Sequence, residues 1–222
     1  MVCGRFGPPE RSGLMDADLS RLVEEIRACR ICRDTPLRTP LPHEPRPVVI
    51  PSSTARVLIA GQAPGTKVHA TGQPFNDRSG DRLRDWLGVT REQFYDPANF
   101  SIVPMGFCFP GQDARGSDLA PRRECAPAWR ERLISRMPQI EIVLAIGLYA
   151  QAWHLGERRA GSLTETVASW RDVFMRNQQP RILPLPHPSW RNTAWLKRNP
   201  WFESDLLPVL RAEIAMRMNV ET

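Results

Sequence analysis

The stretch Arg56-Val57-Leu58-Ile59-Ala60-Gly61-Gln62-Ala63-Pro64-Gly65 decides the fold of this chain. An apolar run, residues 57–60, leads directly into a loop of small residues. A run of this kind predicts a buried strand that ends in a Gly/Pro turn. In open α/β sheets, ligands bind at the carboxyl ends of the strands. We therefore expect a substrate site at this loop.

A second loop has the same character. Pro186-His187-Pro188-Ser189 follows the apolar run at residues 182–185. Apolar runs at 100–103 and 140–146 predict two more strands. Helical patterns are expected at 17–28 with Asp16 as the cap, 79–87, 122–137, 148–155, 164–176 and 204–218. Strands that alternate with helices predict an α/β fold with a parallel sheet and right-handed crossovers.

Composition places the chain among globular proteins. Its 222 residues are 41% hydrophobic, enough for one sizeable core. We expect a flexible, Gly-, Pro- and Arg-rich extension over residues 1–15 and a single domain over 16–222. The six prolines of residues 35–53 predict an extended connector. The chain shows no internal repeat.

The net charge and the hydropathy pattern indicate which macromolecules the protein could bind. The net charge of +6 favours a polyanionic partner such as nucleic acid. The sequence contains no apolar run of about 18 residues and no secretory signal, so we expect no membrane contact and a cytoplasmic location. We also expect a monomer.

Four of the five cysteines form a metal-ligating pattern. Cys29 and Cys32 make a C-x2-C pair, and Cys108 and Cys125 flank a predicted loop. Four thiolates bind either zinc or a four-iron cluster, and spacing alone does not choose between them. The alternative is four buried free thiols. Cys3 lies in the predicted extension and is expected to be unligated.

Taken together, these motifs resemble the uracil-DNA glycosylase superfamily, and its iron–sulfur-containing families in particular. The resemblance covers about residues 22–212. It rests on the first loop, which is Gly-Glu-Ala-Pro-Gly or Gly-Leu-Ala-Pro-Ala in two such families, and on Gly72-Gln73-Pro74-Phe75, Asp77-Arg78-Ser79-Gly80, His187-Pro188-Ser189 and the four cysteines. Each motif is weak alone, but their order and spacing are specific.

The resemblance implies a three-layer α/β/α sandwich around a four-stranded parallel sheet. It implies a base-excision repair enzyme that flips uracil out of DNA and hydrolyses its N-glycosidic bond. It also implies that Cys29, Cys32, Cys108 and Cys125 hold a 4Fe-4S cluster, with zinc as the less favoured alternative. The uracil pocket would be formed by Gly61, Ala63, Pro64, Gly65 and Phe75.

Bond cleavage places negative charge on the leaving base, so the site needs a hydrogen-bond donor at the uracil O2 atom. His187 is the candidate donor, and Phe75 is the candidate ring to stack on the base. The alternatives are a loop histidine that satisfies backbone carbonyls and a phenylalanine of the core.

Water activation is where the chain departs from its relatives. Related enzymes carry an acidic or amide side chain at the position of Gln62 or Ala63. Gln62 can orient a water molecule but cannot accept its proton. Asp77 is therefore a catalytic candidate, although it equally suits the cap of the helix near Ser79. His69 is a further candidate base, although a place on the exposed loop rim is favoured for it.

Base reading and DNA contact complete the expected site. Pro104 stands where related enzymes have an asparagine that reads uracil, so Asn76 becomes the nearest amide candidate, with a turn residue as its alternative. DNA contacts are expected from Lys67, Ser189, Arg191 and Asn192.

The departures from the family leave other functions open. The missing carboxylate is compatible with a protein that binds uracil or damaged DNA without hydrolysis. Pro104 is compatible with a glycosylase for another deaminated base such as hypoxanthine. A cluster-bearing structural or electron-transfer protein is disfavoured by the presence of His187 and Phe75.

Overall fold

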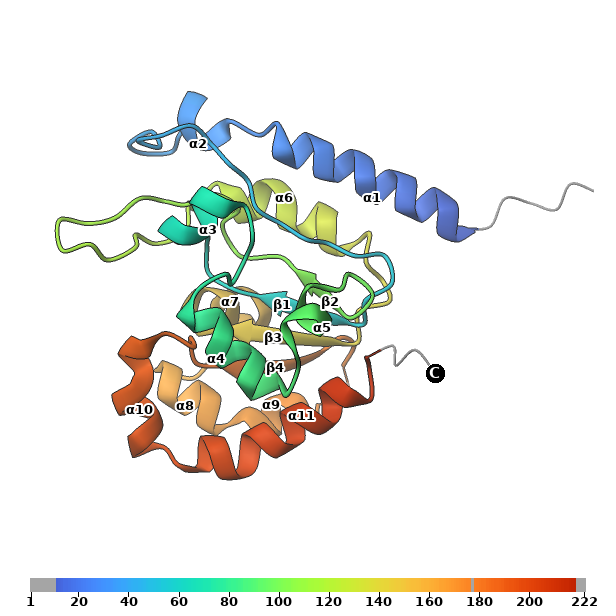
Figure 1. Cartoon of the computed structure of the whole chain (residues 1–222), viewed down its shortest axis with the longest axis vertical. Coiled ribbons are helices and arrows are strands. Elements are labelled where there is room, and N and C mark those ends of the chain that lie inside the picture. The colour runs from blue at the N-terminus through green and yellow to red at the C-terminus, as the bar shows by residue number, and fades with distance from the viewer. Residues whose placement is uncertain (1–10, 177, 219–222) are drawn as a thin grey trace, which may run out of the picture.

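A parallel four-stranded sheet lies at the centre of the molecule (Figure 1). The computed structural model describes residues 11–176 and 178–218, with side chains from residue 17 onward. The strand order is β2-β1-β3-β4, and all three pairings are parallel. The strands are β1 (Val57–Ala60), β2 (Phe100–Ile102), β3 (Ile142–Ile146) and β4 (Arg181–Leu185). The predicted strands and their parallel arrangement are confirmed.

Helices cover both faces of the sheet and give the predicted three layers. Alternate residues of β1 point to opposite faces, so that Val57 and Ile59 join one core and Leu58 and Ala60 the other. The first core is closed by α4 (Arg78–Leu87), α8 (Leu163–Ala168), α9 (Trp170–Phe174) and α11 (Leu207–Ala215). The second is closed by α1 (Arg11–Arg27), α6 (Cys125–Ile134) and α7 (Gly147–Leu155).

Several helix boundaries differ from the predictions. Helix α1 begins at Arg11, so Asp16 lies inside it rather than at its cap. The predicted extension therefore overlaps α1 at residues 11–15, and its remaining part, with Cys3, lies outside the described residues. The helix predicted at 164–176 is divided at Ser169 into α8 and α9. The closing helix begins with a π-helical turn, η3 (Phe202–Leu206), and continues as α11.

The sequence analysis missed four short helices. They are α2 (Ile31–Asp34), α3 (Thr66–Thr71), α5 (Arg91–Tyr95) and α10 (Thr193–Arg198). None is longer than 6 residues, which is too short to show a helical repeat of apolar residues. Two 3-10 turns, η1 (Gly156–Arg158) and η2 (Trp190–Asn192), were missed for the same reason. The connector at 35–53 is non-helical, as predicted.

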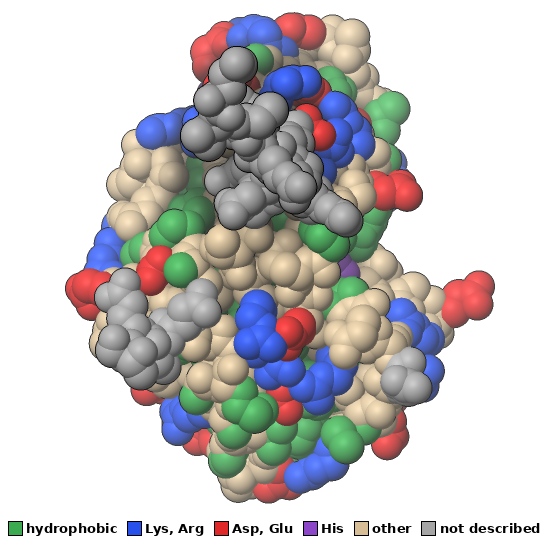
Figure 2. Space-filling view, turned by 90° about the vertical axis from the view of Figure 1, so that its right-hand side faces the viewer, with side chains coloured by type: hydrophobic (Ala, Val, Ile, Leu, Met, Phe, Trp, Pro, Cys, Tyr) green, Lys and Arg blue, Asp and Glu red, His purple; other side chains and the backbone are tan. Residues whose placement is uncertain are grey.

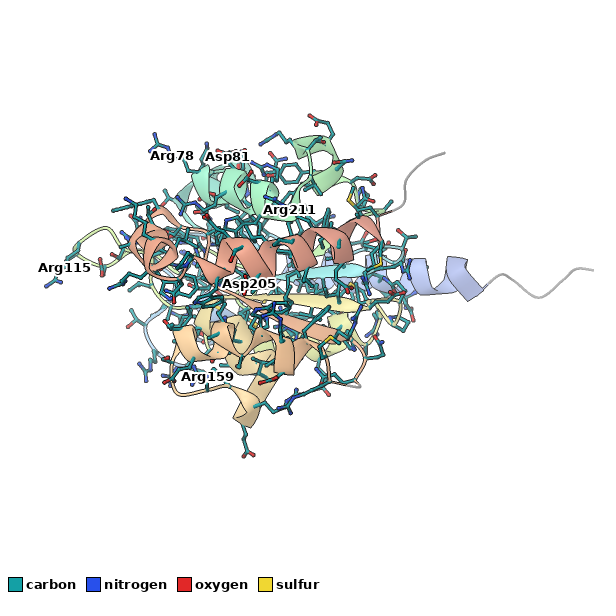
Figure 3. The ribbon with its side chains drawn as sticks, turned by 90° about the horizontal axis from the view of Figure 1, so that it is seen from below. Arg78, Asp81, Arg115, Arg159, Asp205 and Arg211 are labelled. Atoms are coloured by element: carbon teal, nitrogen blue, oxygen red, sulfur yellow. The ribbon has the colours of Figure 1, made fainter. Side chains whose placement is uncertain are left out.

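A narrow loop over residues 111–119 projects beyond α3 (Figure 1). Its two arms meet at an antiparallel bridge between Gln112 and Asp118. At its end, Asp113 Oδ1 accepts hydrogen bonds from the backbone amides of Arg115 and Ser117, both at 2.9 Å. Gly116 adopts the left-handed conformation, with φ of 72°, that closes the turn. Figure 3 shows Arg115 at the end of this loop, directed away from the body of the molecule.

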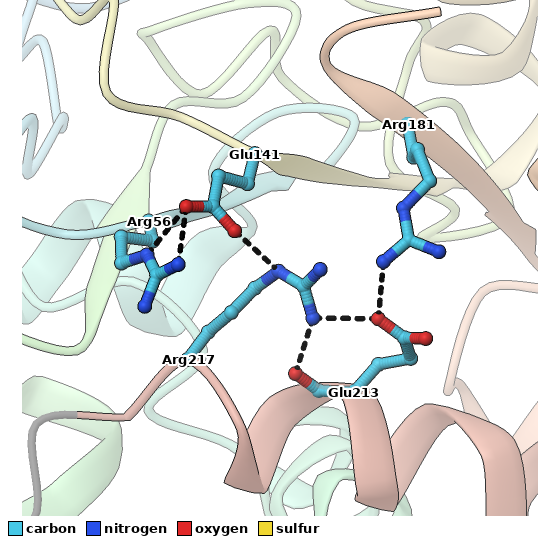
Figure 4. A network of polar contacts seen from close by, with 5 residues as sticks. All are labelled: Arg56, Glu141, Arg181, Glu213 and Arg217. Carbon is cyan, nitrogen blue, oxygen red and sulfur yellow. Dashed lines mark hydrogen bonds and ion pairs between the residues drawn. The ribbon is translucent and has the colours of Figure 1, made fainter. Parts of the chain in front are cut away.

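The amino ends of the strands are tied to α11 by a charged network (Figure 4). Glu141 pairs with Arg56 and, at 3.2 Å, with Arg217. Glu213 of α11 pairs with Arg217 and, at 2.6 Å, with Arg181 at the start of β4. On the side of the molecule that Figure 2 presents, basic and acidic side chains lie next to one another. Among residues 11–176 and 178–218, no helix has the length and apolar character of a membrane span.

Candidate active site

A cleft of about 610 Å³ opens where the carboxyl ends of the strands meet the two predicted loops. A cleft of this size admits a nucleobase with part of its sugar. Nearly all of the predicted site residues line it. These are Gly61, Gln62, Ala63, Pro64, Gly65, Lys67, Phe75, Asp77, His187, Ser189, Arg191 and Asn192.

Phe75 is held in an unusual backbone conformation at the cleft. Its φ of 53° places an aromatic residue in the left-handed region, which is strained for a side chain of this size. Its carbonyl oxygen accepts a hydrogen bond from Nη1 of the buried Arg84 at 3.3 Å. The carbonyl of the preceding Pro74 accepts a hydrogen bond from the hydroxyl of Tyr95 at 2.9 Å. Strain that is fixed by its surroundings in this way is typical of functional sites.

The ring of Phe75 lies against the first loop. A Cβ built on Gly61 would be 3.2 Å from Cζ of the ring, so glycine allows the ring to approach the loop backbone. Phe94 of α5 supports the ring from another side in an edge-on arrangement, with 6.0 Å between the centroids. The ring is therefore fixed in place while it still lines the cleft.

His187 is prepared as a neutral hydrogen-bond donor. The backbone amide of Ser189 donates to Nδ1 of the imidazole at 3.2 Å. In the neutral ring, an accepting Nδ1 leaves the proton on Nε2. Burial lowers the pKa of His187, and the charges of Asp77 and Asp118 only partly oppose this. His187 therefore presents a neutral Nε2–H group, the form of donor that the predicted reaction needs.

The loop that carries His187 is braced by two side-chain contacts. Asn192 Nδ2 donates to the carbonyl of His187 at 2.7 Å. Arg82 of α4 donates to the carbonyl of Ser189 at 3.0 Å and to Oγ1 of Thr193 at 3.2 Å. No local pattern marks the roles of Arg82 and Arg84, because arginines on an amphipathic helix are usually solvated.

Gln62 and Ala63 line the cleft without a charge. A Cβ on Gly147, at the start of α7, would lie 2.8 Å from Nε2 of Gln62. Gly147 therefore makes room for the Gln62 amide, and its φ of 79° is one that favours glycine. The Gln62 carbonyl accepts from the amide of Gly106 at 2.8 Å. The first loop is fixed, but it offers no proton acceptor of its own to a water molecule.

Asp77 is the cap of α4 and also lies at the cleft. Its Oδ1 atom accepts from the backbone amide of Gly80 at 2.9 Å, which makes it the N-cap of α4. The same side chain lines the cleft. One oxygen of the carboxylate is thus engaged in the cap.

Asn76 does not reach the cleft. Its Oδ1 atom accepts a hydrogen bond from Arg91 of α5 at 3.0 Å, and the residue is not part of the cleft lining. The role of Asn76 in reading the base therefore stays a prediction, and its side chain is engaged with Arg91 in this structure. Pro104 does line the cleft, at the predicted place.

His69 also lies outside the cleft lining. Its ring packs beside His43 of the connector, with 4.4 Å between the centroids, and beside Phe109. It is half-buried in this aromatic cluster rather than exposed on a rim. Burial lowers the pKa of His69, and the neighbouring His43 and Arg46 act in the same direction.

Basic and aromatic side chains frame the entrance of the cleft. Lys67, Arg78 and Arg191 line it and are exposed. Trp190 is 70% exposed, with the Arg191 guanidinium 5.6 Å from its ring centroid. These residues are available to a polyanion. Trp195 and Trp201 instead pack against each other and against Phe202, so their role is in the core.

Asp118 is a cleft residue that sequence reasoning missed. It lies in the 111–119 loop and lines the cleft together with the two predicted loops. Its Oδ1 atom accepts from Nε2 of Gln112 at 3.1 Å. No local motif marks it, because it reaches the cleft only through the path of its loop.

The comparison with protein families agrees with this geometry. Residues 47–211 match the family model described as the Uracil DNA glycosylase superfamily. The chain belongs to the uracil DNA glycosylase superfamily. The matched region extends from the connector into α11 and includes both loops of the cleft and every strand of the sheet. For a member of this superfamily, a cleft at the strand ends that opens between basic side chains fits action on DNA.

The four predicted cysteine ligands of this superfamily member converge, although they come from three separate segments of the chain. Cys29, Cys32, Cys108 and Cys125 line one small cavity, closed by apolar neighbours such as Phe107 and Trp129. Among the described residues, no three His, Cys, Asp or Glu side chains are grouped closely enough to hold a single metal ion.

The surroundings of the sulfur atoms suit ligation. The Trp129 indole donates to Sγ of Cys29 at 3.2 Å, and the Phe107 amide donates to Sγ of Cys125 at 3.3 Å. Such N–H···S bonds are among the interactions that tune protein-bound iron–sulfur clusters. Burial raises the pKa of Cys32 to about 11 and that of Cys108 to about 12. A bound metal would have to supply the charge that keeps these groups ionised. The donor set fits a cluster.

Proposed function

We propose that this protein is a uracil-DNA glycosylase that flips uracil out of DNA and hydrolyses its N-glycosidic bond. The observation that carries the proposal is the meeting of Phe75, neutral His187 and the first loop in one cleft. Phe75 stacks on the flipped base, because a flat ring held in advance binds a base at little entropic cost. Lys67 and Arg191 contact the DNA backbone at the rim.

His187 supplies the stabilisation that the leaving base needs. As the N1–C1′ bond breaks, negative charge builds on the uracil and positive charge on the sugar. The Nε2–H group of His187 donates to uracil O2, and backbone amides of the first loop assist. A neutral donor that is already held in place needs no reorganisation during the reaction. Such preorganised donors are the main source of transition-state stabilisation in sites of this type.

The test is release of uracil from DNA. The protein is incubated with single-stranded and double-stranded oligonucleotides that contain one uracil, and abasic sites are then cleaved with alkali. We expect strand cleavage that depends on protein and uracil, and a loss of rate of about 100-fold or more in His187→Ala. Intact strands with both substrates would contradict the proposal.

Two observations favour specific alternatives within the same assay. Gln62 offers no proton acceptor, which favours a protein that binds uracil DNA without hydrolysis. A gel shift without cleavage would support that alternative. Pro104 brings no side-chain donor or acceptor to the base, which favours a broader choice of deaminated base. A hypoxanthine oligonucleotide tests that choice, and faster cleavage of hypoxanthine than of uracil would establish it.

We propose that the four cysteines hold a 4Fe-4S cluster. Their convergence around one small cavity with apolar walls supports a shared metal group, and the resemblance to the iron–sulfur families favours a cluster over zinc. The bound cluster would join the segment of α2, the loop after β2 and the first turn of α6 by covalent ligation. Anaerobically purified protein is expected to be brown, with iron and sulfide in equal amounts and a loss of colour in Cys108→Ser. Colourless protein with stoichiometric zinc would overturn this.

A further inference from the structure

We propose that Asp118 is the catalytic carboxylate of this protein, and that it activates the attacking water from outside the first loop. The inference rests on the proposed function and assigns a residue of the 111–119 loop to that site. Asp118 thereby supplies the carboxylate that is absent at positions 62 and 63 of the first loop.

The first argument is the contact between Asp118 and the first loop. A Cβ built on Gly65 would lie 3.0 Å from Oδ2 of Asp118. A side chain at position 65 would therefore be in tight contact with this carboxylate. Glycine at the end of the first loop lets Asp118 enter the cleft, where both residues are part of the lining.

The second argument is that the exposed carboxylate of Asp118 is oriented by contacts within its own loop. The bridge between Gln112 and Asp118 closes the base of the loop, and the Leu119 amide donates to the Gly111 carbonyl at 2.9 Å. Gln112 also donates to Oδ1 of Asp118, and the Oδ2 atom is the one directed at Gly65. One oxygen thus orients the group while the other faces the loop at which the substrate is expected.

The third argument is electrostatic. The charge of Asp118 acts on His187 and raises the pKa of that histidine against the effect of burial. This places the carboxylate within the electrostatic range of the donor to the leaving base. A negative charge near the sugar also stabilises the positive charge that develops at C1′.

Asp77 is less well placed for this role. It caps α4 through Gly80, and the cap holds the turn that carries Phe75. The neighbouring positions of the first loop, Gln62 and Ala63, carry no charge. The Asp118 side chain does not cap a helix in this way. Its Oδ1 atom accepts a hydrogen bond from Gln112, and an asparagine at position 118 would retain that acceptor.

The proposed step is a hydrolysis. The oxygen of a water molecule forms a bond to C1′ of the deoxyribose while the C1′–N1 bond breaks. The electron pair of that bond leaves with the base, which His187 stabilises through O2. The proton of the water passes to Asp118 and then to solvent, and the uracil anion later takes a proton from solvent. Positioned general bases contribute about 100-fold to 10,000-fold in such steps.

The test compares single-turnover rates of uracil release by wild type, Asp118→Asn and Asp113→Asn. Asp113 is the matched control. It lies at the far end of the same loop, and Asp113→Asn removes the same negative charge there. We expect a loss of about 100-fold or more for Asp118→Asn and less than threefold for Asp113→Asn. Binding of DNA that carries a non-hydrolysable 2′-fluoro-deoxyuridine is expected to change less than threefold in both.

Chemical rescue separates a catalytic role from a structural one. In Asp118→Ala, added formate is expected to restore the rate by about 10-fold, because a small carboxylate can occupy the vacated place. Equal rates for wild type and Asp118→Asn would overturn the inference and leave the proposed function intact. Failure of formate to rescue a slow, DNA-binding variant would also count against it. A wild-type protein without glycosylase activity would overturn the proposed function itself.

Discussion

A Cβ on Gly80 would lie 1.7 Å from the carbonyl oxygen of Phe75. The two residues are therefore packed backbone to backbone, and the left-handed turn at Phe75 depends on glycine in the first turn of α4. Gly80→Ala is expected to displace the ring from the cleft and to slow uracil release by about 100-fold, since small misplacements of positioning groups have effects of this size. Single-turnover kinetics measure the change.

Gly156→Ala is the control for that variant. Gly156 also has a positive φ, of 55°, but a Cβ there meets no atom within 4 Å, so only backbone strain is added. We expect it to lower the melting temperature without slowing the reaction. Equal activity of Gly80→Ala and wild type would show that the ring position is not needed.

Arg82 is expected to govern the position of the second loop rather than to contact phosphate. Loss of its bonds to Ser189 and Thr193 in Arg82→Gln should weaken binding of uracil DNA by about 10-fold, the value of one or two charged hydrogen bonds. The dependence of binding on salt should stay as in wild type, because no phosphate contact is removed. Arg211→Gln on α11 removes the same charge away from the cleft and should bind normally.

The pH dependence of the reaction should report the protonation of His187. Burial lowers its pKa from the ordinary 6.5, so the neutral donor persists below that pH. His187 is expected to contribute a loss of activity as the pH drops through this lowered pKa, when a proton on Nδ1 would oppose the Ser189 amide. The facing groups Asp77 and Asp118 raise the pKa, so Asp118→Asn should move the acid limb to lower pH. An acid limb of the wild type above pH 6.5 would contradict this assignment.

His154 is expected to limit stability in acid. Burial, assisted by the contact with Arg130, lowers its pKa from 6.5 to about 3 in the folded protein. The unfolded chain therefore takes up a proton as the pH falls below 6.5, and the folded protein does so only near pH 3. Stability should decrease over this window by about 1.4 kcal/mol per pH unit from this group. Denaturant unfolding of His154→Gln should show a shallower decrease, and an unchanged slope would refute the assignment.

Glu213 is expected to matter for stability and not for activity. In Glu213→Gln, the nearly buried Arg217 and the half-buried Arg181 lose a charged partner. We expect a loss of about 2 kcal/mol in the free energy of unfolding, below the full cost of a buried unpaired charge because Arg181 is partly solvated. Chemical denaturation measures it, and Asp172→Asn on the exposed side of α9 is the control. A change of less than about 0.5 kcal/mol in the free energy of unfolding, the usual range for surface exchanges, would contradict the prediction.

The strands and long helices could be predicted because their signals are local. The run at 57–60 is apolar throughout since β1 is buried on both faces of the sheet. Helices α3, α5 and α10 left no such signal, because a turn or two does not establish a period. The hydrogen bond of Asn76 to Arg91 and the ring contacts of His69 with His43 and Phe109 could not be predicted, because their partners lie far away in the sequence.

The sequence by itself determined the α/β class and the two loops of the site, because each depends on short contiguous motifs. Only the tertiary structure decided which groups serve those loops. Arg84 reaches the Phe75 carbonyl, and Arg82 reaches Ser189 from 107 positions away. Asp118 enters the cleft because Gly65 leaves space for it. Contacts of this kind depend on the distance between folded segments, and no local pattern of residues encodes that distance.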